Sequence, residues 1–260
     1  ELNIFKDFIS LNPNKLNSFR AVDCSGIQLK TDLNFDAYSM KRSVFDFLLL
    51  EKAKERKINV IQPADVISTA KGNSEFISEI EDGSGQIIQI KSKMVIAAYG
   101  KQNILDKKML RRFVNKRSNL NGVKFHIPLS LLKESFPDEI RIYTNEGLYC
   151  GMNQVSATDM TVCFLENRKE SKIPSRERLI DVIKSNDYFQ KVFSDESIHY
   201  IKTANIYGTG NIYFGKKELV ENGIIMIGDA AHVISPLAGD GIGMAMESAK
   251  LLYEIMSQHK

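Results

Sequence analysis

Residues 228–243 constrain the fold of this chain more than any other stretch. An apolar run, residues 224–227, leads into Gly228 and Asp229, as a buried strand does when it ends at an acidic turn. A loop with three glycines follows, at Gly239, Gly241 and Gly243. Over residues 242–256, apolar side chains recur at spacings of three and four, which predicts an amphipathic helix.

A strand, an acid, a glycine loop and a helix in this order suit a polar, phosphate-linked cofactor. Glycines let backbone amides come close to a ligand because they carry no Cβ atom. The N-terminus of a helix adds free N–H groups and a partial positive charge, which favour anionic groups. The segment therefore predicts a cofactor site at the carboxyl end of a buried strand.

Length and composition indicate an ordinary globular protein. The 260 residues can form one large domain or two smaller ones, and 43% of them are apolar and 26% charged. The net charge of +3 is too small to indicate a nucleic-acid partner. No apolar run is long enough to span a bilayer, and no signal-peptide pattern is present. The three cysteines indicate no disulfide framework, so we expect a reducing, cytoplasmic setting.

The cysteines and histidines do not form a metal-binding pattern. Their spacings match neither a zinc site nor a redox pair: Cys24, Cys150, Cys163, His126, His199, His232 and His259. We therefore expect no bound metal and no disulfide. His232 has two interpretations, a proton-transferring base or a residue packed in the glycine loop, and no catalytic residue is assigned.

Periodicity predicts several helices and strands elsewhere. Helices are expected at residues 43–57, with Ser43 as N-cap, at 103–117 and at 175–193. Strands are expected at 59–62, 64–69, 75–80, 86–90, 94–98, 123–128, 139–143, 147–151, 160–165 and 198–206. Residues 94–98 are continuously apolar and end at Tyr99-Gly100, which predicts a strand buried on both faces.

The stretch 228–243 resembles the second flavin-contacting motif of a known superfamily. These are the FAD-dependent monooxygenases of the para-hydroxybenzoate hydroxylase type and the geranylgeranyl reductases. Ala230-Ala231-His232 and Pro236 also fall at the family's spacing. The resemblance implies an α/β (α+β) fold, in which an FAD-binding Rossmann-like domain carries an inserted mixed β-sheet substrate domain.

The resemblance also implies roles for residues of this motif. Asp229 would accept a hydrogen bond from a ribityl hydroxyl, and the helix that starts near Ile242 would direct its positive end at the flavin pyrimidine. Asp240 replaces a more usual neutral residue, and it either caps this helix or faces the flavin. The expected cofactor-binding residues are Arg42, Gly100, Gly228, Asp229, Pro236, Gly239, Asp240, Gly241, Ile242 and Gly243.

Two further segments resemble family motifs near the cofactor. Arg42, followed by Phe45-Asp46 and Leu49, is similar to a motif whose arginine approaches the ribityl-pyrophosphate region; the alternative is a surface arginine at a helix start. Residues 94–100 are similar to a strand that ends in Asp-Gly in relatives, but Tyr99 stands in place of the acid. That acid is linked to NAD(P)H handling in relatives, so NAD(P)H is only a candidate electron donor.

A pair of strands resembles the substrate wall of the reductase-like branch. Residues 149–153 and 161–165 are similar to this pair, and Tyr149, Gly151 and Cys163 are the residues we expect to line the substrate chamber. The resemblance implies an FAD-dependent oxidoreductase that acts on a small organic substrate. It would either reduce an unsaturated, prenyl- or lipid-like molecule or hydroxylate a substrate with O2. A catalytically decayed flavin-fold protein with a binding or regulatory role is the alternative.

The expected organisation alternates between two domains. Residues 1–36 and 121–210 are assigned to the substrate domain, and 37–120 and 211–260 to the FAD domain. A Gly-x-Gly-x-x-Gly segment after an opening strand is expected in this family and does not occur here, so we interpret the chain as a fragment without the adenosine half of the site. The basic cluster 107–117 predicts a solvated helix face or a peripheral contact with a membrane.

Overall fold

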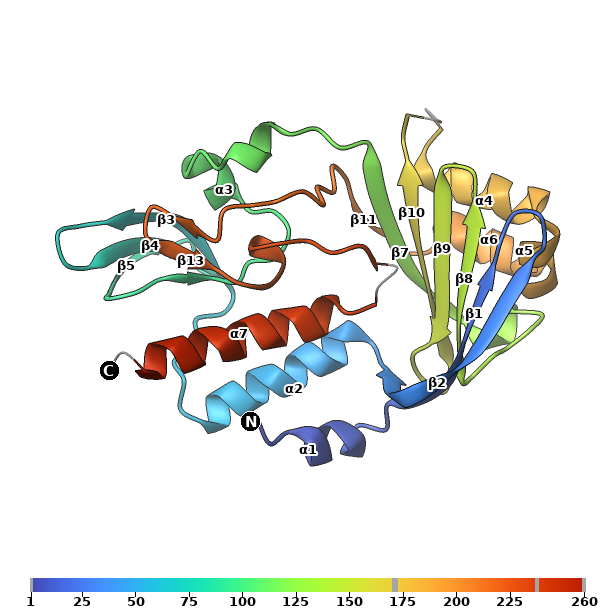
Figure 1. The fold of residues 1–260 in the computed structure, drawn as a ribbon, viewed down its shortest axis with the longest axis horizontal. Helices are drawn as coiled ribbons and strands as arrows, with labels where there is room; N and C mark the ends of the chain where they lie inside the picture. The colour runs from blue at the N-terminus through green and yellow to red at the C-terminus, as the bar shows by residue number, and fades with distance from the viewer. Residues whose placement is uncertain (1, 170–172, 237–238, 259–260) are drawn as a thin grey trace. The chain divides into compact units, whose positions relative to one another are not determined.

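The computed structural model describes residues 2–169, 173–236 and 239–258. It consists of two compact units, each built from two stretches of sequence. The first unit comprises Glu1–Ile58 and Asn119–Asn211, and the second comprises Asn59–Ser118 and Ile212–Lys260. Helices combined with several sheets confirm the predicted α/β class (Figure 1).

The first unit is built around a mixed sheet of seven strands. These are β1 (Asn14–Val22), β2 (Gln28–Ser39), β7 (Leu120–Pro128), β8 (Glu139–Asn145), β9 (Leu148–Gln154), β10 (Asp159–Asn167) and β11 (Tyr207–Thr209). Their order is β11-β7-β10-β9-β8-β1-β2, and only β1 and β8 are parallel neighbours. The four strands predicted between residues 121 and 166 are therefore confirmed.

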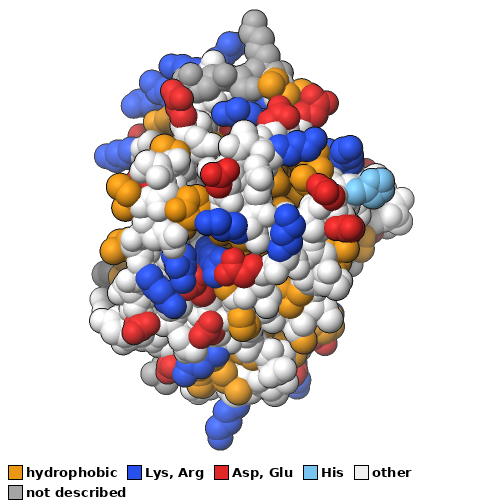
Figure 2. All heavy atoms as spheres, turned by 90° about the vertical axis from the view of Figure 1, so that its right-hand side faces the viewer, with side chains coloured by type: hydrophobic (Ala, Val, Ile, Leu, Met, Phe, Trp, Pro, Cys, Tyr) orange, Lys and Arg blue, Asp and Glu red, His pale blue; other side chains and the backbone are white. Residues whose placement is uncertain are grey.

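One face of this sheet forms the core of the first unit. Successive side chains of a strand point to opposite faces, so Phe125 and Ile127 of β7 are fully buried while His126 between them is on the other face. Three helices pack on the apolar face: α4 (Ser175–Ser185), α5 (Asp187–Val192) and α6 (Asp195–Thr203) (Figure 1). The face of the molecule drawn in Figure 2 carries interspersed basic and acidic side chains.

Helix α6 replaces the strand predicted at 198–206. Ser194 and Ser197 form a reciprocal capping box at its start, in which each hydroxyl accepts the other residue's backbone N–H at 3.0–3.1 Å. Ser197 and Ile201, four residues apart, are both fully buried. The prediction was wrong because the apolar residues of this segment also match the helical spacing that the cap selects.

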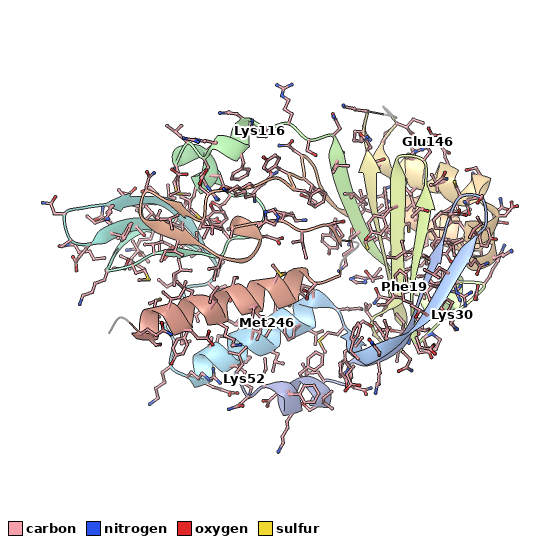
Figure 3. All side chains as sticks on the ribbon, viewed as in Figure 1. Phe19, Lys30, Lys52, Lys116, Glu146 and Met246 are labelled. Atoms are coloured by element: carbon pink, nitrogen blue, oxygen red, sulfur yellow. The ribbon has the colours of Figure 1, made fainter. Side chains whose placement is uncertain are left out.

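Helices α1 (Phe5–Ser10) and α2 (Arg42–Glu55) also belong to the first unit. Helix α2 confirms the predicted helix, but its N-cap is Lys41 with no side-chain cap, so Ser43 was wrongly assigned that role. Helix α1 lies beside it (Figure 1). Lys52 of α2, labelled in Figure 3, pairs with Asp7 of α1 at 3.0 Å.

The second unit contains two small sheets. One is the antiparallel meander β3 (Ala64–Lys71), β4 (Phe76–Asp82) and β5 (Ile87–Ser92), which confirms the predicted hairpin. The other contains β12 (Val220–Glu221), β13 (Ile224–Met226) and β6 (Ile96–Ala97). Residues 59–62 form no strand, which contradicts the prediction. Strand β6 is shorter than predicted, and Ile96 is 42% exposed rather than buried on both faces.

The predicted basic helix at 103–117 is two short helices. These are α3 (Ile104–Lys108) and the 3-10 helix η1 (Arg112–Asn115). Leu110 between them has φ +57°, a left-handed conformation that interrupts a right-handed helix. Arg111 is 1% exposed, so the prediction of a solvated face is wrong for this residue.

Helix α7 (Gly241–Gln258) confirms the helix predicted after the glycine loop. A 3-10 turn, η3 (Gly228–Ala230), connects β13 to this region. No described residue of α7 is buried, and Met246, labelled in Figure 3, is 37% exposed. The apolar periodicity thus predicted the helix correctly, although Ala245, Leu252 and Met256 are only half-buried among the described residues.

Candidate functional site

The two strands expected to end at the cofactor are neighbours in the second unit. Strands β6 and β13 are parallel, with Ile225 opposite Ile96 and Met226 opposite Ala97. The Ile227 N–H donates to the Ala97 carbonyl at 3.1 Å. Because the carboxyl ends of parallel strands meet at one edge, the loops that begin at residues 99 and 228 lie at the same edge. This is where ligands bind in open α/β sheets.

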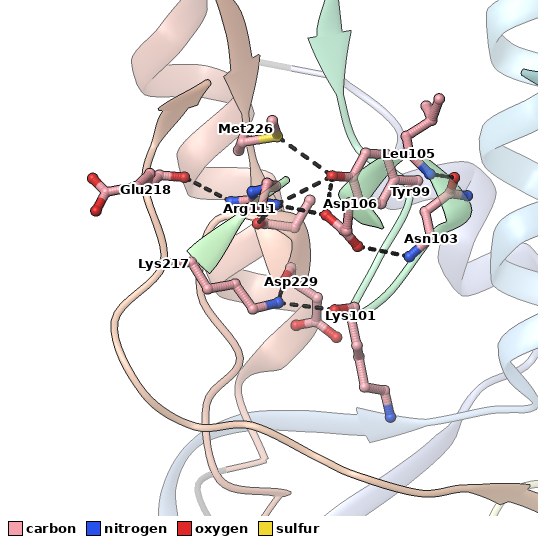
Figure 4. A network of polar contacts seen from close by, with 11 residues as sticks. Tyr99, Lys101, Asn103, Leu105, Asp106, Arg111, Lys217, Glu218, Met226 and Asp229 are labelled. Carbon is pink, nitrogen blue, oxygen red and sulfur yellow. Dashed lines mark hydrogen bonds and ion pairs between the residues drawn. The ribbon is translucent and has the colours of Figure 1, made fainter. Parts of the chain in front are cut away.

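A buried lysine joins these two loops. The Lys217 ammonium donates to the carbonyls of Lys101 and Asp229, both at 2.9 Å (Figure 4). Lys217 is 4% exposed and its ammonium lies 4.4 Å from the centre of the Phe113 ring. Burial lowers its pKa, and the charge of Asp106 opposes that effect. Lys217 therefore holds the backbone of one loop against that of the other.

Arg111 makes a second buried connection beside it. Its Nη1 donates to Asp106 Oδ1 at 2.9 Å, to the Tyr99 hydroxyl at 3.1 Å and to the Ala230 carbonyl at 3.0 Å. Its Nη2 donates to the Glu218 carbonyl at 2.7 Å (Figure 4). The arginine thereby fixes the turn that follows β13 to the turn that follows β6.

Tyr99, which stands where the resembled motif has an acid, belongs to this network. Its hydroxyl donates to Asp106 Oδ1 at 2.5 Å, and burial together with Asp106 raises its pKa. The Asp106 carboxylate also accepts the Asn103 backbone N–H at 2.7 Å and completes a capping box of α3. The substituted position therefore has a structural partner in this chain.

Gly228 is required by packing. Its φ is +57°, and a Cβ atom there would lie 3.1 Å from the Cβ of Ala245 in α7. Its N–H donates to the Ser248 hydroxyl at 3.0 Å. The turn thus contacts α7 closely, and the structure gives Gly228 a role that is independent of any ligand.

Three other predicted glycines border open space. Cβ atoms built at Gly100, Gly239 and Gly241 would meet no atom within 4 Å among the described residues that are not their chain neighbours. Gly100 and Gly239 have φ values of +85° and +66°, which other residues adopt at a cost. These are glycines without a packing reason, and the space beside them fits a cofactor that passes close to the backbone.

The remaining loop residues have distinct surroundings. Asp229 is half-buried, and in the network of Figure 4 its backbone carbonyl, not its carboxylate, accepts the hydrogen bond from Lys217.

The Asp240 carboxylate lies over Gly243, where a Cβ would overlap it, which favours the helix-capping interpretation of Asp240. The Gly239 N–H donates to the Pro236 carbonyl at 3.0 Å, and Pro236 and Ile242 are exposed. Residues 237–238 lie outside the described residues.

His232 is an exposed side chain. Its backbone N–H donates to the Gly228 carbonyl at 3.0 Å, which is part of the turn after β13. The interpretation of His232 as a residue packed inside the loop is therefore wrong. Its interpretation as a base stays a prediction.

The expected substrate-wall residues lie together in the first unit. Cys163 of β10 is opposite Gly151 of β9, and a Cβ at Gly151 would lie 3.3 Å from its Sγ and 3.5 Å from the Tyr149 hydroxyl. Burial raises the pKa of the Cys163 thiol and of the Tyr149 hydroxyl, so both stay protonated near neutral pH. A protonated thiol is a poor nucleophile, which agrees with the role of a wall residue.

Arg42 lies in the first unit, at the first position of α2. Its Nε pairs with Asp46 Oδ1 at 2.5 Å, one helical turn on, and both side chains are about half exposed. Arg42 and Asp46 therefore pair with each other within the motif, whereas contact of Arg42 with a cofactor stays a prediction.

Sequence reasoning missed the connecting residues Lys217, Arg111 and Asp106. No motif marks them, since Lys217 lies in an irregular segment and Arg111 in a basic cluster typical of a surface. The described residues contain no group of His, Cys, Asp or Glu side chains that could hold a metal ion. In the same described part of the chain, no helix is both long and apolar enough to cross a bilayer.

Comparison with known proteins decides the family. A model of the FAD binding domain family matches residues 29–259. The chain belongs to this family. Its predicted cofactor, FAD, is thereby confirmed, and the open space beside Gly100, Gly239 and Gly241 fits it.

Individual relatives are distant. The chain is 22% identical over 231 residues to the digeranylgeranylglycerophospholipid reductase of Methanococcus vannielii, a match that covers 86% of this chain and 55% of that protein. The chain thus spans about half the length of this curated relative.

Solved structures show the same fold at low identity. A flavoprotein/dehydrogenase from Cytophaga hutchinsonii superposes with a TM-score of 0.77 at 16% identity, over 98% of this chain and 65% of that one. A myxobacterial chondrochloren halogenase superposes with a TM-score of 0.78 at 14% identity, over 96% of this chain and 61% of that one. A geranylgeranyl bacteriochlorophyll reductase-like protein from Thermoplasma acidophilum superposes with a TM-score of 0.69 at 17% identity, over 95% of this chain and 63% of that one.

Proposed function

We propose that this chain is part of an FAD-dependent oxidoreductase. The observation that carries the proposal is the pair of parallel strands β6 and β13, whose following loops are joined by Lys217 and border open space at glycines. Bound FAD would supply the redox chemistry, either to reduce an unsaturated, prenyl- or lipid-like molecule or to hydroxylate an organic substrate with O2.

The chain's own residues would bind and orient the cofactor. Gly100 and Gly239 would let the backbone approach it, and the half-buried Asp229 would accept a hydrogen bond from a ribityl hydroxyl. The N-terminus of α7, at Gly241, would place its partial positive charge near the flavin pyrimidine. Lys217 would keep both loops in register, because it binds a carbonyl in each.

The proposal also gives each unit a role and names an electron donor and a cellular location. The sheet of the first unit would present a small organic substrate along Tyr149, Gly151 and Cys163, and the second unit would bind FAD. NAD(P)H is the candidate electron donor, and Arg42 a candidate cofactor contact. We propose a cytoplasmic protein without a nucleic-acid partner; contact of residues 107–117 with a membrane surface is the alternative.

A second candidate function is a flavin-fold protein that has lost catalysis. The observation that favours it is Tyr99, which replaces an acid of relatives and is held by Asp106 and Arg111 within the protein. Such a protein would retain the fold and have a binding or regulatory role. Addition of FAD to the purified full-length protein separates the two functions, since persistent absence of flavin absorbance supports the second.

The Gly241→Ala variant tests the placement of the cofactor. Its Cβ would meet no atom of the other described residues within 4 Å, and alanine is a better helix former than glycine by about 1 kcal/mol, so the fold should not be weakened. If FAD lies against this glycine, its dissociation constant, measured by flavin fluorescence, should rise about tenfold or more, which corresponds to about 1.4 kcal/mol.

The matched control is Gly208→Ala. Gly208 lies in the exposed strand β11, and its Cβ would make only an ordinary contact at 3.9 Å. This variant should bind FAD as the parent protein does. Equal FAD affinity of the Gly241→Ala variant and the parent would contradict the proposed site.

A further inference from the structure

Three residues form one rung across the sheet of the first unit. Thr161 of β10 is opposite His126 of β7 on one side and Asn153 of β9 on the other. Residues directly opposite in antiparallel strands have side chains on the same face, with Cβ atoms about 4.5–5.5 Å apart. Since Phe125 and Ile127 point to the core, this rung lies on the face opposite α4–α6.

Two polar atoms of this rung are buried without a partner. Thr161 is 7% exposed, and neither its hydroxyl nor the Nδ1 of His126 makes a hydrogen bond within the part of the chain that the structure describes. A buried polar atom without a hydrogen bond destabilises a protein, and native proteins contain few of them. Two on neighbouring positions of one rung indicate a ligand that supplies the missing hydrogen bonds.

The charges around the rung favour an anionic ligand group. Burial, together with the charges of Lys124 and Lys41, lowers the pKa of His126, and Asp159 opposes this. Lys41 is paired with Asp159 at 2.9 Å, which offsets both charges. Lys124 has the same orientation as His126, two residues along β7, and it also lowers the pKa of Cys163. An imidazole, a hydroxyl and an ammonium together match a group with several anionic oxygens.

Beyond the Lys124 ammonium, the same face becomes less polar. Lys124, Cys163 and Gly151 form the adjacent rung, and Tyr149 is opposite Leu165 in the one after it. The Cys163 sulfur and the Tyr149 ring pack over Gly151, where a Cβ would lie 3.3 Å from the sulfur. A polar end and a less polar strip on one sheet face suit an amphipathic molecule.

We propose that His126, Thr161 and Lys124 bind the carboxylate or phosphate group of an amphipathic substrate whose apolar part lies along Tyr149, Gly151 and Cys163. The role as substrate rests on the proposed function, whereas the binding of an anionic group rests on the two unpartnered atoms and on Lys124. The site therefore has a test that requires neither FAD nor turnover.

Calorimetric titration of the full-length protein with three ten-carbon probes tests the site. Decanoate and decyl phosphate carry the anionic group, and decanol carries the same chain without it. We expect one or both anions to bind at least about tenfold more tightly than decanol, because hydrogen bonds to charged groups are the stronger ones. The tighter of the two anions identifies the group, carboxylate or phosphate.

The Thr161→Val variant separates a binding role from a structural one. It removes an unpartnered buried hydroxyl with little change of shape, so we expect the melting temperature to rise by about 2–4 °C. The same variant should bind the tighter anion about tenfold more weakly, and Lys124→Gln should weaken it similarly. The control Thr31→Val, on the exposed strand β2, should change neither property.

Two outcomes would overturn the inference. One is equal affinity for decanol and for both anions. The other is unchanged anion affinity in both Thr161→Val and Lys124→Gln. A separate FAD titration distinguishes this failure from that of the proposed function: FAD binding without anion preference refutes only the anion site, and anion preference without FAD binding refutes only the proposed function.

Discussion

Replacing Arg111 with methionine should strongly destabilise the second unit. Arg111 is 1% exposed, and it donates to the Asp106 carboxylate, the Tyr99 hydroxyl and the carbonyls of Ala230 and Glu218. Methionine fills much of the same volume without any donor. The change therefore removes the buried charge of Arg111. It leaves the Asp106 carboxylate and the carbonyls of Ala230 and Glu218 without this donor.

The expected loss follows from these contacts. Asp106 is 2% exposed, and breaking a buried ion pair by removal of one partner costs about 3–5 kcal/mol. The two carbonyls lose hydrogen bonds worth about 1 kcal/mol each, and the contributions overlap because all belong to one network. We expect about 4 kcal/mol in total, a large part of the roughly 5–15 kcal/mol by which domains are stable.

A double variant isolates the electrostatic part. Asp106→Asn removes the charge and keeps an oxygen that can accept the Asn103 N–H at the start of α3. The double variant Arg111→Met/Asp106→Asn should therefore be more stable than Arg111→Met alone by about 1–2 kcal/mol, since no unpaired charge remains.

The assay is urea unfolding followed by circular dichroism, combined with hydrogen exchange. Exchange of amides in residues 104–111 and 224–232 should accelerate in Arg111→Met, because these segments are connected by the arginine. The matched control is Arg112→Met, since Arg112 is the exposed neighbour. Equal losses in the Arg111 and Arg112 variants, or a double variant no more stable than Arg111→Met, would refute the reasoning.

Two further predictions concern acid stability and a glycine. Burial raises the pKa of Glu139, but hydrogen bonds from Arg20 and Arg141 outweigh it and lower the pKa from 4.5 to about 2. The ionised Glu139 therefore stabilises the folded state above pH 4.5, and this stabilisation is lost as the pH falls from 4.5 to about 2. The free energy of unfolding, measured with urea at a series of acid pH values, should fall by at most about 3 kcal/mol from this cause. Glu139→Gln should abolish this dependence. Gly228→Ala should lower the free energy of unfolding in urea by about 2 kcal/mol, because φ is +57° and the new Cβ would lie 3.1 Å from the Ala245 Cβ. The control Gly208→Ala should lower it little. Equal losses in the two variants would contradict the packing role of Gly228.

The sequence alone predicted the elements that depend on local pattern. The hairpin around residues 82–85, the four central strands of the large sheet and α7 all follow from periodicity and turn residues. The family and its cofactor followed from residues 228–243, because glycine positions in a cofactor loop are set by backbone geometry, which is local.

Only the tertiary structure decided the connections between these elements. The sequence of residues 103–117 predicts one helix, yet the helix is interrupted at Leu110, and Arg111 is buried against the turn after β13. Lys217 has no sequence pattern, because its partners are carbonyls about 12 and 116 residues away. The rung of His126 and Thr161 likewise exists only through strand register, which brings together residues that no local spacing relates.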